Sequence, residues 1–164
     1  MDQDRFIGID VGTSGCRAVV IDADGTVIES AATALPPSQH PLPGYSEQRP
    51  GDWWRGLLDT VRGLTPENRA RCRALCIDAT SSTPLLSDRS GNPLTPGLMY
   101  DDRRAGDAAA LIARYAPPES PARGAGSALS KLLHLVDSIP SAAAAHALHQ
   151  ADWIGGRLRG RFGD

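Results

Sequence analysis

The chain lacks a strong charge of either sign, and its basic side chains are nearly all of one kind. Its 164 residues hold 17 basic and 19 acidic side chains, and 16 of the basic residues are arginine. Such a balance gives no field that attracts nucleic acid or an anionic membrane. No apolar run approaches the roughly 18 residues of a membrane span, and residues 1–5 do not resemble a signal peptide. We therefore expect no nucleic-acid partner, no membrane and a cytoplasmic location.

Cysteine is scarce too. Cys16, Cys72 and Cys76 are an odd number with no disulfide-like framework, and no histidine pair stands at zinc-finger spacing. His146 and His149 lack the i, i+4 spacing and the intervening glutamate of a helical zinc site. The sequence predicts a reducing compartment and no structural zinc.

The first part of the chain has the pattern of short strands. Residues 6–10 and 17–22 are apolar runs separated by a glycine-rich turn, and strands so close in sequence pair antiparallel. Asp24-Gly25 is a hairpin signal, because glycine tolerates a positive φ, and a third strand begins at residues 26–28. We expect a three-stranded antiparallel meander.

A proline-rich stretch and a helix follow. Residues 35–50 contain five prolines and are predicted to form a surface loop. Asp52 is the expected N-cap of a helix over residues 53–62, whose apolar side chains recur at helical spacing and should pack on the sheet.

The rest of the chain passes from strands to helices. Strands are predicted at residues 74–78 and 83–86, the latter in a hairpin with residues 94–100 through a turn at 88–91. Beyond Asp102 the predicted helices span residues 104–115, 128–136, 141–148 and 152–158. Strands first and helices later indicate an α/β fold with a mixed sheet covered by helices.

Residues 8–15, Gly-Ile-Asp-Val-Gly-Thr-Ser-Gly, carry the clearest chemical signal. A tight turn of glycines and hydroxyl residues presents backbone N–H groups to an anion. Asp10, at the end of the strand, suits Mg²⁺, which a protein commonly holds through a single carboxylate or through its waters. A plain hairpin in which Asp10 caps its own turn is the alternative. The spacing is neither that of a P-loop nor that of a Rossmann turn.

This hairpin resembles the first phosphate-binding hairpin of the acetate and sugar kinase, Hsp70 and actin superfamily. Later stretches look like motifs of the FGGY carbohydrate kinases. Residues 44–48 and 52–54 are similar to the G-[WY]-x-E-Q…W-W stretch, and residues 91–94 and 100–104 to the G-x-P-L…W-x-D-x-R stretch, with Tyr100 replacing Trp. The resemblance runs from about Phe6 to Phe162, with the motifs in the family's order.

The resemblance implies ATP and Mg²⁺ as cofactors. Asp10 falls where the family places the carboxylate that positions metal and phosphate, and Thr13 where it places a hydroxyl near the transferred phosphate. Gly12, Ser14 and Gly15 complete the phosphate turn.

The resemblance also implies a substrate loop. Residues 78–83, Asp-Ala-Thr-Ser-Ser-Thr, occupy the loop that contacts sugar hydroxyls in the family, and they look more like ribulose-type than glycerol kinases. The implied sugar contacts are Thr80, Ser81, Ser82 and Asp102. The alternatives are a turn whose hydroxyls bind their own backbone, and an Asp102 that only caps a helix.

For architecture, the resemblance implies an RNase-H-like (actin-like ATPase) half domain. Residues 1–164 are expected to form the N-terminal, sugar-binding side of an FGGY kinase, incomplete and without the second, ATP-binding domain. The family's catalytic base, an Asp in a later G-x-G-D-like segment, is not in the chain. The chain alone is therefore expected to be inactive. A fragment of a larger domain exposes sheet edges, so a homodimer stays an open alternative.

The function implied is ATP-dependent phosphorylation of a small sugar or polyol. A pentulose such as ribulose or xylulose is the first candidate, and glycerol the second. The rival is a non-enzymatic relative of the superfamily that binds sugar or nucleotide as a sensor or as an inactive homologue. A repressor of this kind needs a helix-turn-helix before the hairpin, and only five residues precede Phe6.

Overall fold

The computed structural model describes residues 4–140 and 143–162. Their contacts divide the chain into two units. The first is formed by the chain up to Pro37 together with Gly51–Ala79, and the second by Ser38–Pro50 together with the chain from Thr80 onward. The interpretation of the chain as one incomplete domain stays a prediction.

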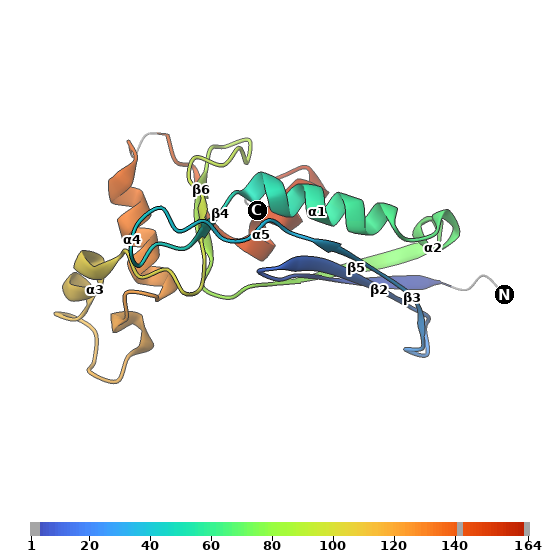
Figure 1. Cartoon of the computed structure of the whole chain (residues 1–164), viewed down its shortest axis with the longest axis horizontal. Coiled ribbons are helices and arrows are strands. Elements are labelled where there is room, and N and C mark those ends of the chain that lie inside the picture. The colour runs from blue at the N-terminus through green and yellow to red at the C-terminus, as the bar shows by residue number, and fades with distance from the viewer. Residues whose placement is uncertain (1–3, 141–142, 163–164) are drawn as a thin grey trace. The chain divides into compact units, whose positions relative to one another are not determined.

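A four-stranded sheet forms the centre of the first unit. β1 (Arg5–Val11), β2 (Gly15–Ile21) and β3 (Val27–Ala34) pair antiparallel in chain order, and β5 (Cys72–Ala79) lies parallel to β1. The order across the sheet is β3-β2-β1-β5. Figure 1 shows this sheet nearly edge-on, with β2, β3 and β5 labelled. Both the predicted meander and the predicted mixed sheet are confirmed.

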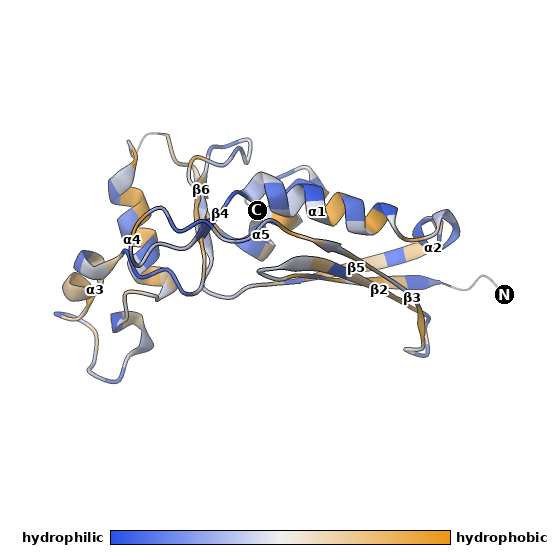
Figure 2. Ribbon diagram, viewed as in Figure 1, coloured by the Kyte–Doolittle hydropathy of each residue, from blue (hydrophilic) through white to orange (hydrophobic). Residues whose placement is uncertain are grey.

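One face of this sheet packs against α1 (Pro50–Arg62). A Cβ atom on Gly56 would lie 2.3 Å from Cδ2 of Leu35, just beyond β3, so a larger residue there would require the Leu35 side chain to move. Apolar and polar residues alternate along α1 as expected for a half-buried helix (Figure 2). The buried side chains come from alternate positions of β1 and β2 and from one face of α1, and include Ile7, Ile9, Val20, Trp53 and Leu57.

The start of α1 differs from the prediction. The helix begins at Pro50, so Asp52 lies in its first turn rather than at the N-cap, and its carboxylate accepts a hydrogen bond from Arg55. Proline is favoured in the first turn because its missing N–H would have no partner there. The short helix α2 (Pro66–Ala70) follows and is capped by the Thr65 side chain.

The second unit contains two small sheets and the later helices. β4 (Glu47–Gln48) pairs with β7 (Gly97–Leu98), and β6 (Pro84–Ser87) pairs with β8 (His146–His149), both antiparallel. The helical elements are α3 (Gly106–Ile112), the 3-10 turn η1 (Pro121–Arg123), α4 (Ala128–Ser138) and α5 (Gln150–Arg159). The predicted helices over residues 128–136 and 152–158 are confirmed, and that over 104–115 is shorter than predicted.

One prediction for this unit is wrong, and another holds only in part. Residues 141–148 were predicted to form a helix, but residues 146–148 belong to the strand β8, and residues 141–142 lie outside the described part. Pairing of β8 with all four residues of β6 overrides the helix propensity of the alanine run. The hairpin partner predicted for residues 83–86 also differs. The turn at 88–91 forms, with Gly91 at φ +79°. The returning chain bridges Ser87 at Pro93, and Leu94 N–H donates to the Leu86 carbonyl over 2.8 Å, but residues 97–98 then pair with β4 instead of β6.

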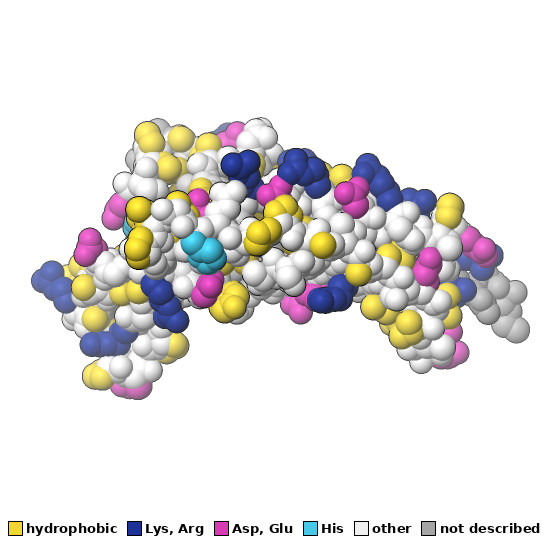
Figure 3. All heavy atoms as spheres, in the orientation of Figure 1, with side chains coloured by type: hydrophobic (Ala, Val, Ile, Leu, Met, Phe, Trp, Pro, Cys, Tyr) yellow, Lys and Arg dark blue, Asp and Glu magenta, His cyan; other side chains and the backbone are white. Residues whose placement is uncertain are grey.

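The surface agrees with the near-neutral composition. On the face shown in Figure 3, acidic and basic side chains of the described residues lie interspersed. Within residues 4–140 and 143–162, no helix has the length and apolar character needed to cross a membrane. All three cysteines carry free thiols.

Candidate functional site

Asp10 lies next to the last residue of β1, in the first unit. Strand pairing places it opposite Arg17 of β2 and level with Asp78 of β5. Arg17 Nη1 donates to Asp10 Oδ2 over 3.4 Å, and the two side chains are 63% and 49% exposed. Such an exposed pair contributes at most about 1 kcal/mol to stability. Asp10 can therefore exchange Arg17 for a ligand at little cost.

A hollow of about 330 Å³ opens beside Asp10. It lies on the sheet face whose residues alternate with the buried ones, and Arg17 and Asp78 line it with Asp10. Gly8, Val19 and Cys76 supply an apolar floor. Polar groups at the rim of a small apolar hollow are a common arrangement for a ligand site.

The turn that follows β1 is tight and sterically crowded on one side. Gly12 N–H donates to the Gly15 carbonyl over 3.0 Å, and a Cβ atom on Gly15 would lie 3.1 Å from the Thr33 carbonyl oxygen. Glycine at position 15 therefore keeps the turn close to β3. Ser14 is exposed at the tip, and Thr13 is half-buried. The predicted phosphate turn, residues 12–15, thus adjoins Asp10 in one unit.

These residues fit a nucleotide with Mg²⁺. The Asp10 carboxylate is a hard oxygen ligand next to a turn of small residues. In the described part of the chain, no cluster of three or more His, Cys, Asp or Glu side chains could hold a metal ion. A divalent cation brought by phosphate groups needs no such cluster, because the phosphates and waters complete its coordination.

Of the predicted substrate loop, residues 78–83, the part from Thr80 onward belongs to the second unit and is held there by hydrogen bonds. Thr80 N–H donates to Gln150 Oε1 over 3.0 Å, and Gln150 N–H returns a bond to the Thr83 carbonyl over 3.1 Å. The Ser82 hydroxyl donates to the Gly126 carbonyl over 3.0 Å. Ser82 has a φ of 51°, which non-glycine residues seldom adopt.

Among the three predicted sugar contacts of this loop, the hydroxyls of Thr80 and Ser82 bind other protein groups. Ser81 is exposed, and only its carbonyl is used, by the Thr83 hydroxyl over 3.1 Å. The structure therefore leaves the Ser81 side chain exposed, while the hydroxyls of Thr80 and Ser82 stabilise the loop. The assignment of all three to sugar stays a prediction.

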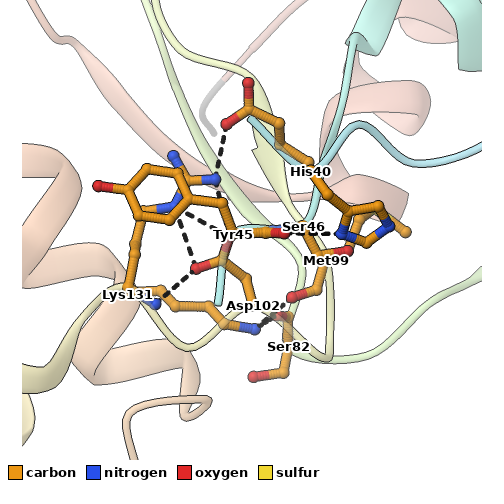
Figure 4. A network of polar contacts seen from close by, with 9 residues as sticks. His40, Tyr45, Ser46, Ser82, Met99, Asp102 and Lys131 are labelled. Carbon is orange, nitrogen blue, oxygen red and sulfur yellow. Dashed lines mark hydrogen bonds and ion pairs between the residues drawn. The ribbon is translucent and has the colours of Figure 1, made fainter. Parts of the chain in front are cut away.

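Asp102 is completely buried in a second group of the same unit, shown in Figure 4. Its Oδ2 accepts a bond from Ser46 N–H at 2.7 Å and from Arg104 Nε at 2.9 Å, while Oδ1 accepts from Arg104 N–H at 3.0 Å. Arg104 also donates to Glu47 Oε2 over 2.6 Å and lies over the Tyr45 ring, 3.8 Å from its centroid. We call these five residues the arginine cluster.

Electrostatics in the arginine cluster favour the charged guanidinium. Burial by itself would lower the pKa of Arg104, but the hydrogen bonds from Arg104 to Asp102 and Glu47 raise it above its ordinary value. The Asp102 carboxylate thus has its lone pairs committed to protein donors. Its assignment as a sugar contact stays a prediction, and what the structure shows is an anchor for residues 44–47.

Sequence reasoning missed two buried polar residues that hold this unit together. Lys131 of α4 and Gln150 of α5 are both fully buried, and both bond to the loop of residues 80–83. Gln150 had no signal in the sequence. Lys131 had one, because it is the single lysine among 17 basic residues.

Over residues 5–162 the chain matches the sequence profile of the FGGY family of carbohydrate kinases, N-terminal domain. The chain belongs to this family. An FGGY relative from Rhodospirillum centenum, a glycerol kinase, is 37% identical over 113 residues, which make up 66% of this chain and 22% of that protein. A xylulose kinase of Klebsiella pneumoniae is 32% identical over 109 residues, or 65% of this chain and 22% of that protein.

Solved structures show the same fold. A xyloylose kinase from Brucella ovis superposes with a TM-score of 0.81 at 22% identity, covering 93% of this chain and 34% of that one. The chain thus has the actin-like fold of FGGY kinases, with a mixed α/β sheet, as predicted. It spans about a fifth of the length of the two curated relatives.

Proposed function

We propose that the chain is the first part of an ATP-dependent kinase that phosphorylates a pentulose such as ribulose or xylulose. Membership of the FGGY family carries the proposal, together with a half-exposed Asp10 beside a tight turn of small residues. The relatives named above include both a xylulose kinase and a glycerol kinase, so glycerol is the second candidate. By "the whole kinase" we mean the polypeptide that carries this chain together with a second, ATP-binding domain.

In this proposal Asp10 holds Mg²⁺ directly or through water, and residues 12–15 orient the phosphates. The bound cation would offset the negative charge that develops as the phosphoryl group moves. The sugar hydroxyl attacks the γ-phosphorus, its proton goes to a base beyond this chain, and ADP leaves. This chain contributes positioning and electrostatics, which are most of what phosphoryl transfer requires.

The preference for a pentulose is supported by the resemblance of residues 78–83 to the corresponding loop of ribulose-type kinases. In the second unit, this loop exposes the hydroxyl-bearing side chain of Ser81. Small polar residues at such a position suit a ligand with several hydroxyls. A screen of the whole kinase with ribulose, xylulose and glycerol, detecting ADP release, tests the proposal. Binding of ATP and sugar without turnover of any of them would favour the non-enzymatic relative instead.

The Ser81→Ala substitution is expected to weaken use of the sugar and leave use of ATP unchanged. Loss of one hydrogen bond to a substrate hydroxyl lowers kcat/KM for the sugar about 10-fold to 100-fold. Ser90→Ala, which removes another exposed hydroxyl in a turn of the same unit, is the matched control. Steady-state kinetics with each substrate varied in turn provide the measurement. An effect confined to the KM for ATP would show that Ser81 does not contact the sugar.

The chain of residues 1–164 by itself is expected to phosphorylate no sugar. It offers a carboxylate and a phosphate turn, while proton removal and closure over ATP are assigned to parts outside it. A coupled ADP assay on the purified chain, with the whole kinase as positive control, makes the comparison. Turnover of a pentulose by the chain alone would show that the base lies within these residues.

A further inference from the structure

The single lysine of the chain is fully buried, on α4. All 16 other basic residues are arginine, so the exception stands out in the composition. An ammonium group is a compact donor with three N–H bonds around one atom, whereas guanidinium is a planar fork. Burying either is costly unless its donors are satisfied. The partners of Lys131 therefore show what the lysine is for.

Lys131 joins two segments that are far apart in the sequence. Its Nζ donates to the Ser82 carbonyl over 2.8 Å and to the Met99 carbonyl over 2.6 Å (Figure 4). The Met99 carbonyl also accepts a bond from Asp102 N–H over 2.9 Å. One ammonium thus ties the loop of residues 80–83 to the segment that leads into the arginine cluster.

The contact to Ser82 falls on the most constrained residue of that loop. Ser82 has the only positive φ among the described non-glycine residues, so its backbone conformation must be maintained by its surroundings. Two bonds fix it: the hydroxyl to Gly126, and the carbonyl to Lys131. Ser81, the exposed residue, precedes it directly. Release of the Ser82 carbonyl would therefore change where the Ser81 hydroxyl points.

We propose that Lys131 is a positioning residue of the sugar site: by joining the carbonyls of Ser82 and Met99, it holds the loop so that Ser81 faces the sugar. The proposal rests on the proposed kinase function for its sugar part. Lys131 touches no sugar itself, because its side chain is enclosed by protein. It acts through the backbone of Ser82.

Kinetics of three variants in the whole kinase test the role. Lys131→Met keeps the length of the side chain and removes its donors; we expect kcat/KM for the sugar to fall 10-fold to 100-fold, mainly through KM, with the KM for ATP within twofold of wild type. Lys131→Arg keeps the charge and supports folding, but its planar fork should not restore sugar use. Leu129→Met, at an exposed position of the same helix, is the matched control. Wild-type kinetics in Lys131→Arg would show that the loop does not require a compact donor at this position, contrary to the proposal.

Hydrogen exchange tests the anchor independently of catalysis. In Lys131→Met, peptides covering residues 80–83 and 99–102 should exchange at least tenfold faster, while peptides of β1 and β2 keep their wild-type rates. Unchanged exchange in residues 80–83 overturns the anchor. Faster exchange with unchanged sugar kinetics overturns the positioning role. If the wild-type kinase phosphorylates no sugar, the proposed function and the sugar part of this proposal are both overturned. The exchange rates of residues 80–83 would still show whether Lys131 holds this loop.

A pH profile adds a readout that a packing role would not give. Burial lowers the pKa of Lys131 to about 8. The carboxylates of Asp102 and Asp101 raise this pKa, whereas the positive charges of Arg103 and Arg104 lower it further. The ammonium therefore loses its proton, and donates more weakly, above about pH 8. We expect kcat/KM for the sugar to fall there in wild type relative to Lys131→Met. Parallel profiles for the two proteins would count against the proposal.

Discussion

Asp10→Ala in the whole kinase is expected to lower kcat by about a thousandfold or more, with the fold intact. Removal of the carboxylate misplaces the metal that offsets charge on the transferring phosphoryl group, and about 4 kcal/mol of barrier corresponds to a factor of a thousand. The fold should tolerate the change, because Asp10 is half-exposed and its ion pair with Arg17 lies at the surface. Initial rates with saturating ATP and sugar provide the measurement.

Two further variants make this result specific. Asp10→Asn keeps the shape of the side chain and removes its charge, so it should lose nearly as much activity as Asp10→Ala. Asp24→Ala removes an exposed carboxylate from the turn between β2 and β3 of the same sheet and should stay within twofold of wild type. Circular dichroism checks the fold of all three. A well-folded Asp10→Ala enzyme within tenfold of wild type would remove Asp10 from the phosphate site.

The sequence predicted the first unit well because its structure is local. β1, β2 and β3 follow one another through short turns, so alternation and the Asp24-Gly25 signal suffice to define the meander. The parallel strand β5 was also found, since its apolar run is distinct. The start of α1 was misplaced by three residues because Asp52 and Pro50 both suit a first helical turn.

The second unit was predicted less well because its contacts join distant segments. β6 and β8 are separated by about 60 residues, and nothing in the alanine-rich stretch before β8 indicates a strand. The motifs at residues 44–48 and 100–104 were recognised separately, yet the hydrogen bonds of Asp102 and Arg104 to residues 46 and 47 could not be predicted from either. The motif alone therefore cannot decide whether Asp102 contacts the sugar or anchors residues 44–47.

Asp102→Ala decides between these two roles, and we expect a loss of about 3 kcal/mol in the free energy of unfolding. The substitution removes one of two carboxylates that neutralise Arg104 and leaves the buried Ser46 N–H without its acceptor. Glu47 stays beside Arg104, so the loss should lie at the lower end of what removal of a buried ion-pair partner costs. Asp101→Ala, which removes the exposed neighbouring carboxylate, is the matched control and should change stability by less than about 0.5 kcal/mol.

The double variant Asp102→Ala/Arg104→Met separates charge from packing. If the arginine cluster stabilises the protein mainly by keeping a buried charge paired, removal of both partners should recover part of the stability lost in Asp102→Ala alone. Urea unfolding of wild type, Asp102→Ala, Arg104→Met and the double variant, followed by circular dichroism, gives the coupling between the two residues. An Asp102→Ala protein that unfolds like wild type but needs far more sugar for half-maximal rate would restore Asp102 to the sugar site. The reverse result would be a loss of stability with unchanged sugar kinetics at a temperature where the variant is folded. It would make Asp102 the anchor of residues 44–47, because a carboxylate enclosed by protein donors stabilises the fold without contacting the ligand.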